Sequence, residues 1–194
     1  MQLEVEQKYV VDDFTAIEAK LAELDARVGP PVEQCDRYFA HPSRDFAETD
    51  EALRIRRCGH QSFITYKGPK LDATTKTRRE LELPLAAEEA TSEKVVEQFA
   101  ELLTALGFTP VAEVCKHRRP ATLDWQNQFV RVVLDSVDGL GAGGSGTFVE
   151  LELVVDEAEQ SAATSVIESL AVHLGLTRVE RRSYLELLLE KTAE

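Results

Sequence analysis

The stretch QLEVEQKYV, residues 2–10, sets the class of fold because its side chains alternate in character with a period of two. One face of this segment is largely apolar, and the other carries Glu4, Glu6 and Lys8. Alternation of this kind is typical of a β-strand that buries one of its faces. The stretch therefore predicts a strand that covers a hydrophobic core and presents charges of both signs on its other side.

Later segments repeat this pattern and predict an antiparallel sheet. The expected strands cover residues 33–41, 52–58, 61–68, 76–85, 110–118, 121–125, 128–137 and 147–155. Their polar faces hold charged side chains in phase, namely Arg54, Arg56, Lys67, Arg78, Glu80, Glu82, Lys116, Arg118, Arg131, Asp135, Glu150 and Glu152. The opposite faces should pack against helices. The residues expected on these outer faces include Leu3, Val5, Leu81, Leu83, Val149, Leu151 and Leu153.

Four segments predict helices. The first runs from a cap at Asp12 or Asp13 to about Arg27, and the others cover residues 90–106, 158–174 and 182–191. Gly107 and Gly175 follow the second and third helices in similar contexts, which hints at two similar halves. A chain of 194 residues without an interdomain linker predicts one domain, residues 1–194.

The charged faces of the strands allow two interpretations. On an open sheet they would be solvated, and each cross-strand ion pair would contribute only ~0.2–1 kcal/mol. In a sheet closed into a barrel they would line the lumen, where uncompensated charges cost several kcal/mol each, in order of magnitude. Clustered carboxylates would then favour Mg²⁺ or Mn²⁺, and the arginine and lysine side chains would favour a polyanion. Metal and phosphate together satisfy both sets of charges.

Composition and charge limit the partners and the compartment. The net charge of −13 repels nucleic-acid backbones and anionic membranes, so we expect neither as a partner. The N-terminus lacks the pattern of a signal peptide, and no apolar run approaches the ~18 residues of a membrane span, which predicts a cytoplasmic protein. Cys35, Cys58 and Cys115 are odd in number and lack CxxC spacing, so we expect thiols rather than a disulfide or a zinc site.

Other motifs are set aside on their context. The glycine pattern GLGAGG at residues 139–144 matches a dinucleotide-binding fingerprint, but it lies between two expected strands, where a hairpin loop belongs. The histidines have no ligand spacing, and no GxSxG motif is present. These observations argue against a Rossmann-type nucleotide site, a histidine-ligated metal and a serine hydrolase.

The charged strands carry a family resemblance. Glu4, Glu6 and Lys8 form an ExExK motif that is similar to the N-terminal signature of the CYTH superfamily, named for class IV adenylyl cyclase and thiamine triphosphatase. Further blocks resemble the class IV cyclase branch in order along nearly the whole chain. They are CDRYF at 35–39, LRIR at 53–56, TYKGP at 65–69, RRELE at 78–82, KHR at 116–118, LDSVDGLG at 134–141, FVELE at 148–152 and SYLELL at 183–188.

The resemblance implies an α+β fold with a closed eight-stranded antiparallel β-barrel, whose tunnel binds a triphosphate together with Mg²⁺ or Mn²⁺. It implies metal ligation by Glu4, Glu6, Asp135, Glu150 and Glu152. It implies phosphate binding by Lys8, Arg54, Arg56, Lys67, Arg78, Lys116 and Arg118. Asp36, Glu80 and Glu82 would support these groups, and Lys8, Glu4 and Glu6 would act in catalysis.

The resemblance also implies a metal-dependent enzyme that acts on an organic triphosphate, most like a class IV adenylyl cyclase converting ATP to cyclic AMP and pyrophosphate. Hydrolysis of thiamine triphosphate or tripolyphosphate stays open, as does a non-catalytic module that binds polyphosphate or nucleotide. The intact Glu-x-Glu pairs favour catalysis. A long loop at 142–147 and the pair Arg119-Pro120 depart from the family pattern and bear on substrate identity. We expect loops 68–75 and 139–146 near the tunnel mouths, and a homodimer is left open.

Overall fold

A computed structural model describes residues 2–69, 78–85, 91–141 and 145–193 of the chain. Residues 70–75, which make up most of the first expected mouth loop, lie outside the described residues, as do Lys76 and residues 142–144 of the second loop.

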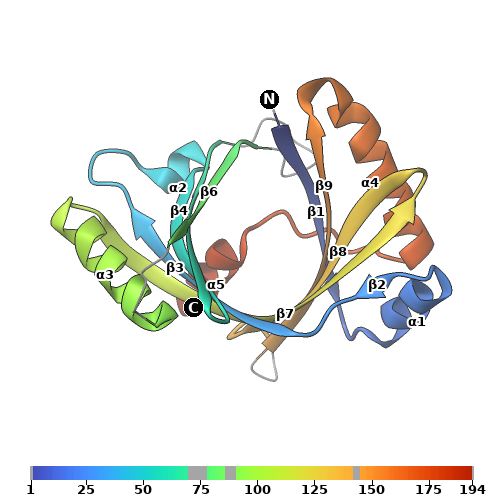
Figure 1. Cartoon of the computed structure of the whole chain (residues 1–194), viewed down its shortest axis with the longest axis horizontal. Coiled ribbons are helices and arrows are strands. Elements are labelled where there is room, and N and C mark those ends of the chain that lie inside the picture. Colours follow the sequence, from blue (N-terminus) through green and yellow to red (C-terminus); the bar gives the residue numbers. More distant parts are fainter. Residues whose placement is uncertain (1, 70–77, 86–90, 142–144, 194) are drawn as a thin grey trace.

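The described chain is built around one antiparallel sheet that curls strongly about a central opening (Figure 1). Eight strands follow one another in the order β1-β9-β8-β7-β3-β4-β5-β6, and a short strand β2 pairs with β7. The bounds of these strands are β1 Gln2–Val11, β2 Arg27–Val28, β3 Val32–Ala40, β4 Ala52–Cys58, β5 Gln61–Lys67, β6 Glu80–Leu85, β7 Thr109–Trp125, β8 Gln128–Asp138 and β9 Ser145–Asp156.

The two ends of this strand order approach each other. An isolated antiparallel bridge joins Glu4 of β1 to Arg78, two residues before β6. Within the described parts of the chain, this is the only β-bridge between the first and last strands of the order. The sheet is therefore a strongly curled half-barrel whose edges meet at one point.

Some helices cover the outer face of the sheet, and others border its interior. They are α1 Thr15–Glu23, α2 Phe46–Thr49, α3 Ser92–Ala105, α4 Gln160–Leu174 and α5 Tyr184–Ala193, with a 3₁₀ turn at Glu157–Glu159 before α4. Helix α4 packs on β1 and β9, whereas α3 packs on β4 and β5 (Figure 1). Gly107 and Gly175 have φ angles of 92° and 76° after α3 and α4, a left-handed conformation that glycine adopts without strain.

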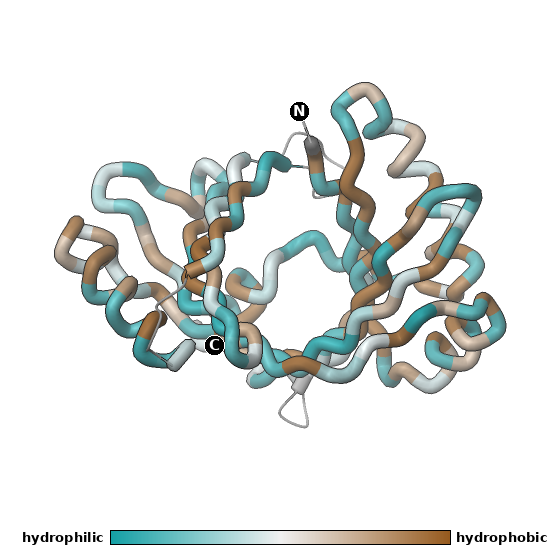
Figure 2. The backbone as a smooth tube through the Cα atoms, viewed as in Figure 1, coloured by the Kyte–Doolittle hydropathy of each residue, from teal (hydrophilic) through white to brown (hydrophobic). Residues whose placement is uncertain are grey.

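The strand phase expected from the sequence is confirmed on β1, β9 and β6, but the expected helix cover over β6 is wrong. Val5, Val149 and Leu151 are completely buried in the core beneath α1 and α4. Figure 2 shows hydrophobic and hydrophilic residues alternating along the strands of the sheet. Leu81 and Leu83 also point away from the interior, but they are 45% and 64% exposed. They are uncovered because β6 is the last strand of the order, and α3 packs on β4 and β5 instead.

The two strands expected at 110–118 and 121–125 are one continuous strand, β7. It contains Pro120, although proline has no N–H for the ladder. The carbonyl of Pro120 accepts a hydrogen bond from the Gly29 N–H at 2.7 Å, between the regions where β2 and β3 pair with β7. The N–H that Pro120 lacks would thus face the gap between β2 and β3, where neither strand pairs with β7.

The expectation of three thiols is wrong. Cys35 and Cys115 form a disulfide with Cα atoms 4.1 Å apart, and Cys58 is free. The two residues are direct partners in the register of β3 and β7, although they are 80 residues apart in sequence. Counting cysteines could not reveal this pairing, because it depends on which strands are neighbours.

No helix in the described parts is long and apolar enough to cross a membrane.

Candidate active site

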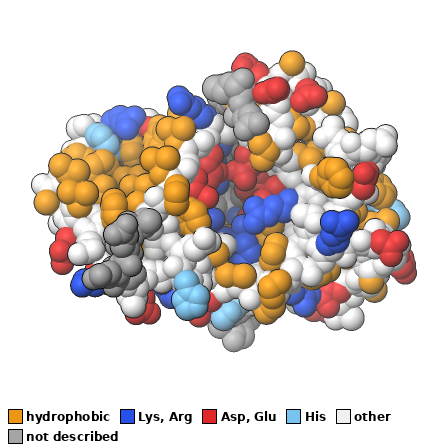
Figure 3. All heavy atoms as spheres, in the orientation of Figure 1, with side chains coloured by type: hydrophobic (Ala, Val, Ile, Leu, Met, Phe, Trp, Pro, Cys, Tyr) orange, Lys and Arg blue, Asp and Glu red, His pale blue; other side chains and the backbone are white. Residues whose placement is uncertain are grey.

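The interior of the curled sheet is a charged cavity of about 950 Å³. Figure 3 shows acidic and basic side chains gathered in the hollow at its centre. Nearly all of the charged residues that the sequence places in phase line this cavity, namely Glu4, Glu6, Lys8, Arg54, Arg56, Lys67, Arg78, Glu80, Glu82, Lys116, Arg118, Arg131, Glu150 and Glu152. Asp36 and Asp135 lie directly behind this lining and hold its arginines. The charged faces thus turn inward, as the barrel interpretation predicts.

Three carboxylates gather on two neighbouring strands. Glu4, Glu6 and Glu152 have oxygen atoms within 4.8 Å of one another, and Glu6 pairs directly with Glu152 in the register of β1 and β9. Burial raises the pKa of Glu152 to about 7, and the nearby carboxylates of Glu4 and Glu150 add to this rise. Such a cluster is costly without a cation, and its oxygen ligands suit Mg²⁺ or Mn²⁺.

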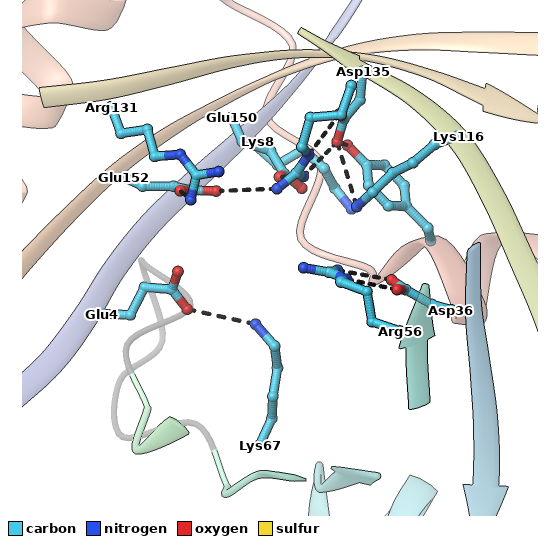
Figure 4. A network of polar contacts seen from close by, with 12 residues as sticks. Glu4, Lys8, Asp36, Arg56, Lys67, Lys116, Arg131, Asp135, Glu150 and Glu152 are labelled. Carbon is cyan, nitrogen blue, oxygen red and sulfur yellow. Dashed lines mark hydrogen bonds and ion pairs between the residues drawn. The ribbon is translucent and has the colours of Figure 1, made fainter. Parts of the chain in front are cut away.

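Asp135 and Glu150 belong to a different group, centred on Arg118. The Arg118 guanidinium donates two hydrogen bonds to the Asp135 carboxylate, at 2.8 and 2.6 Å, and a third to Glu150. Asp135 is completely buried, and the Lys116 ammonium lies 3.7 Å from it (Figure 4). The structure therefore brings Glu4, Glu6 and Glu152 together as a potential metal site and places Asp135 and Glu150 against an arginine.

A second arginine group lies on β3 and β4. Asp36 accepts hydrogen bonds from Arg56 at 2.6 and 2.8 Å and from Arg54 at 3.2 Å. Burial alone would raise the pKa of Asp36, but the two guanidinium groups hold it well below its usual range. The carboxylate thus stays ionised and fixes both arginines at the cavity wall.

Lys67 connects this wall to the carboxylate cluster. Its ammonium lies 2.6 Å from a Glu80 oxygen and 3.5 Å from a Glu4 oxygen (Figure 4 shows the contact with Glu4). Although burial raises the pKa of Glu80, Lys67 and other partners lower it to about 2. Glu82 is further toward the exposed end of β6 and accepts a hydrogen bond from Thr65 at 3.0 Å. Glu80 and Glu82 thus orient neighbouring groups.

Lys116 and Lys8 complete the basic wall at the end closed by α5. Both are almost fully buried. Burial, together with the positive charge of Arg118, lowers the pKa of Lys116 to about 8. The Lys8 ammonium donates to the backbone oxygen of Arg182 at 2.6 Å and lies 3.9 Å from the centre of the Tyr184 ring.

Arg131 and Tyr184 contact these charged groups and were not among the predicted site residues. Arg131 forms an ion pair with Glu152 at 3.0 Å, and its place in phase with Asp135 was a usable signal. Tyr184 reaches the cavity from α5 and contacts Lys8, Lys116 and Asp135. No periodicity could assign it, because its helix is distant in sequence from every strand it contacts.

Comparison with known proteins identifies the family. A model of the CYTH domain matches residues 2–184. The chain belongs to the CYTH domain family. It is 33% identical to a protein of Methanocaldococcus jannaschii named a putative adenylate cyclase, over 95% of this chain and 98% of that protein.

Solved structures of similar proteins share the fold of this CYTH chain. A protein from Pyrococcus horikoshii is 40% identical, with a TM-score of 0.78, over 97% of this chain and 99% of that one. A Hippeastrum protein, described as a putative adenylyl cyclase with a dominant triphosphatase activity, is 16% identical. It has a TM-score of 0.62 over 98% of this chain and 96% of that one. At that identity, the second comparison concerns the fold alone.

Proposed function

We propose that this CYTH protein is a divalent-metal-dependent enzyme that acts on an organic triphosphate, with cyclisation of ATP as its first candidate reaction. The observation that carries the proposal is the segregation of charge in the cavity. A carboxylate cluster of Glu4, Glu6 and Glu152 faces a wall of arginine and lysine side chains. A metal–triphosphate complex supplies the cation for one part and the anion for the other.

The carboxylate cluster fits a hard divalent cation. Its three residues offer oxygen ligands only, and they leave room for water or phosphate oxygens to complete the six ligands that Mg²⁺ prefers. A bound ion would stabilise negative charge on the reacting phosphoryl group and lower the pKa of an attacking oxygen. In this proposal Asp135 and Glu150 act beside the metal site, by orienting Arg118.

The basic wall fits the phosphates. Arg54, Arg56 and Arg118 are buried or nearly so and are each held by a carboxylate, so their remaining N–H groups are oriented before a ligand arrives. Oriented guanidinium groups bind phosphate oxygens through paired hydrogen bonds and stabilise charge that develops during phosphoryl transfer. Lys67, Arg78, Lys116 and Lys8 add positive charge around the same cavity.

In the cyclisation reaction, the 3′-oxygen of the ATP ribose attacks the α-phosphorus. The bond from that phosphorus to the bridging oxygen of pyrophosphate breaks, the 3′-hydroxyl loses its proton, and cyclic AMP and pyrophosphate are formed. In this proposal Lys8, Glu4 and Glu6, which line the cavity, orient the reacting groups. The relative from Methanocaldococcus jannaschii, named a putative adenylate cyclase, supports this candidate.

Hydrolysis of a triphosphate is the second candidate. The same metal and phosphate groups would serve attack by water on the terminal phosphorus, with loss of phosphate. The described activity of the Hippeastrum protein motivates this alternative, although that comparison rests on fold. The substrate would be thiamine triphosphate, tripolyphosphate or ATP.

We further propose that the sheet forms a closed barrel and that the chain is a single domain, in line with the bridge from Glu4 to Arg78.

A substrate panel tests the proposal. The protein is incubated with ATP, thiamine triphosphate or tripolyphosphate, with Mg²⁺ or Mn²⁺, and each product is identified rather than only released phosphate. Cyclic AMP with pyrophosphate supports cyclisation, whereas a diphosphate with phosphate supports hydrolysis. Loss of activity in excess chelator is expected in either case. If no compound is turned over with either metal, the enzyme proposal is wrong.

A further inference from the structure

Tyr184 is the first residue of α5 and lies where this helix closes one end of the cavity. The Ser183 hydroxyl accepts a hydrogen bond from the Glu186 N–H at 3.1 Å, and the Glu186 carboxylate accepts one from the Ser183 N–H. This reciprocal capping box fixes where the helix begins. It directs the Tyr184 side chain into the interior, where it is 7% exposed and packs against Phe148.

The aromatic ring of Tyr184 lies against two ammonium groups. The centre of the ring is 3.9 Å from the Lys8 nitrogen and 5.0 Å from the Lys116 nitrogen. The negative face of an aromatic ring attracts cations, most strongly where water is excluded. Since both lysines are almost fully buried, the ring offsets part of their desolvation and fixes their position.

The hydroxyl group of Tyr184 acts on a third cation. It donates a hydrogen bond at 3.0 Å to the Asp135 oxygen that also accepts from Arg118. Burial raises the pKa of Tyr184 well above its usual value, so the hydroxyl keeps its proton and remains a donor. Asp135 is itself completely buried between these two donors.

We infer that Tyr184 is a positioning residue for the phosphate site, holding Lys8 through its ring and Arg118 through its hydroxyl and Asp135. Helix α5 is then part of the binding site rather than a cover over it. Three cations grouped without a ligand repel one another, and Tyr184 restrains them in the arrangement that a triphosphate requires. This inference rests on the proposed function, because it assigns the role of Tyr184 to triphosphate binding.

Two substitutions separate the two contacts. Tyr184→Phe keeps the ring and removes the hydroxyl, whereas Tyr184→Leu removes both. Calorimetry with magnesium tripolyphosphate should show roughly tenfold weaker binding for Tyr184→Phe, the size expected for one hydrogen bond to a charged group. Tyr184→Leu should weaken binding by about a further tenfold, because the cation–π contacts are also lost.

A matched control distinguishes positioning from general stability. Tyr9 is also a buried tyrosine and donates a hydrogen bond to Gln7, but it packs in the core on the outer face of the sheet. Tyr9→Phe should lower the melting temperature without changing the affinity of the folded protein. Tyr184→Phe should change affinity, and this loss should disappear when Asp135→Asn is already present. The additional loss in Tyr184→Leu should likewise become smaller in a Lys8→Met background, where only the contact between the ring and Lys116 is left to lose.

The possible outcomes separate this inference from the proposed function. Equal affinity of the wild-type and Tyr184→Phe proteins would overturn the inference, as would losses that simply add in the double variants. If Tyr184→Leu fails to fold, Tyr184→Phe with Asp135→Asn still decides the result. A wild-type protein that does not bind magnesium tripolyphosphate would overturn the proposed function, and the inference with it.

Discussion

Single carboxylates determine how the cavity presents its positive charges. Asp36 holds Arg54 and Arg56, and Asp135 holds Arg118, so each guanidinium is oriented before a ligand is present. Breaking one such buried pair leaves an uncompensated charge, which typically costs about 3–5 kcal/mol. The carboxylates behind the wall are therefore as important to its geometry as the arginines that form it.

Arg56 and Arg57 test which face of β4 binds phosphate. Arg56 lines the cavity, whereas Arg57 points outward and forms an ion pair with Glu33 at 2.8 Å. Arg56→Ala should weaken triphosphate binding by roughly 1.5–3 kcal/mol, the contribution of a hydrogen bond to a charged group. Arg57→Ala should leave binding unchanged in the same calorimetric titration. Equal losses in the two variants would show that the phase of the strand is misassigned.

The raised pKa of Glu152, about 7, predicts a pH-dependent metal affinity. In the metal-free protein this carboxyl is mostly protonated at pH 6, and a cation must displace the proton. Affinity for Mn²⁺ should therefore increase between pH 6 and pH 8, with proton release at the lower pH. Since a folded carboxyl with a raised pKa favours the protonated form, the metal-free protein should also lose stability as pH rises from about 4.5 to about 7.

Titrations of Mn²⁺ at pH 6, 7 and 8 measure this dependence. Glu152→Gln is the control, because it cannot titrate and should show weak affinity with a flatter pH profile. Affinity in the wild-type protein that does not change across this range would contradict the assignment of Glu152 as a metal ligand.

At the scale of helices and strands, the sequence predicts which face of a strand a residue occupies better than where a strand ends or which elements lie beside it. Alternation placed Glu4, Glu150 and the other in-phase charges on one side, and this is confirmed by the cavity lining. The continuity of β7 was missed, because Pro120 is accommodated only where the paired strand is interrupted. The exposure of Leu83 was also missed, since it depends on which strand lies at the end of the order. These outcomes depend on tertiary neighbours that local periodicity does not contain.

The disulfide between β3 and β7 should stabilise the sheet. It links residues 80 positions apart, so it restricts a long loop in the unfolded chain. Such a link typically contributes about 2–5 kcal/mol to the free energy of unfolding. Urea unfolding of Cys35→Ser should show a loss of this order, whereas Cys58→Ser, which removes the free thiol, should have a smaller effect. Equal stability of the Cys35→Ser and wild-type proteins would show that the disulfide is not formed in solution.

At the scale of the whole molecule, the protein has a negative net charge, but one wall of its cavity is positively charged. The net charge is −13, yet buried arginines and lysines line one wall of the interior. Composition therefore argues against extended polyanions such as nucleic acid without excluding a small polyphosphate. Family motifs supplied the residue roles, but the separation of Glu4, Glu6 and Glu152 from Asp135 and Glu150 required the three-dimensional structure.

Calorimetry of triphosphate binding, with and without Mg²⁺, examines whether the cavity binds metal and phosphate jointly. The wild-type protein should bind one non-hydrolysable ATP analogue per chain, at least tenfold more tightly with Mg²⁺, about 1.4 kcal/mol. Glu6→Gln and Glu152→Gln should abolish this difference. Glu113→Gln should preserve it, because Glu113 lies on the outer face and pairs with Arg37. Equal affinity with and without Mg²⁺ in the wild-type protein, or an undiminished metal effect in both cavity variants, would contradict a joint site.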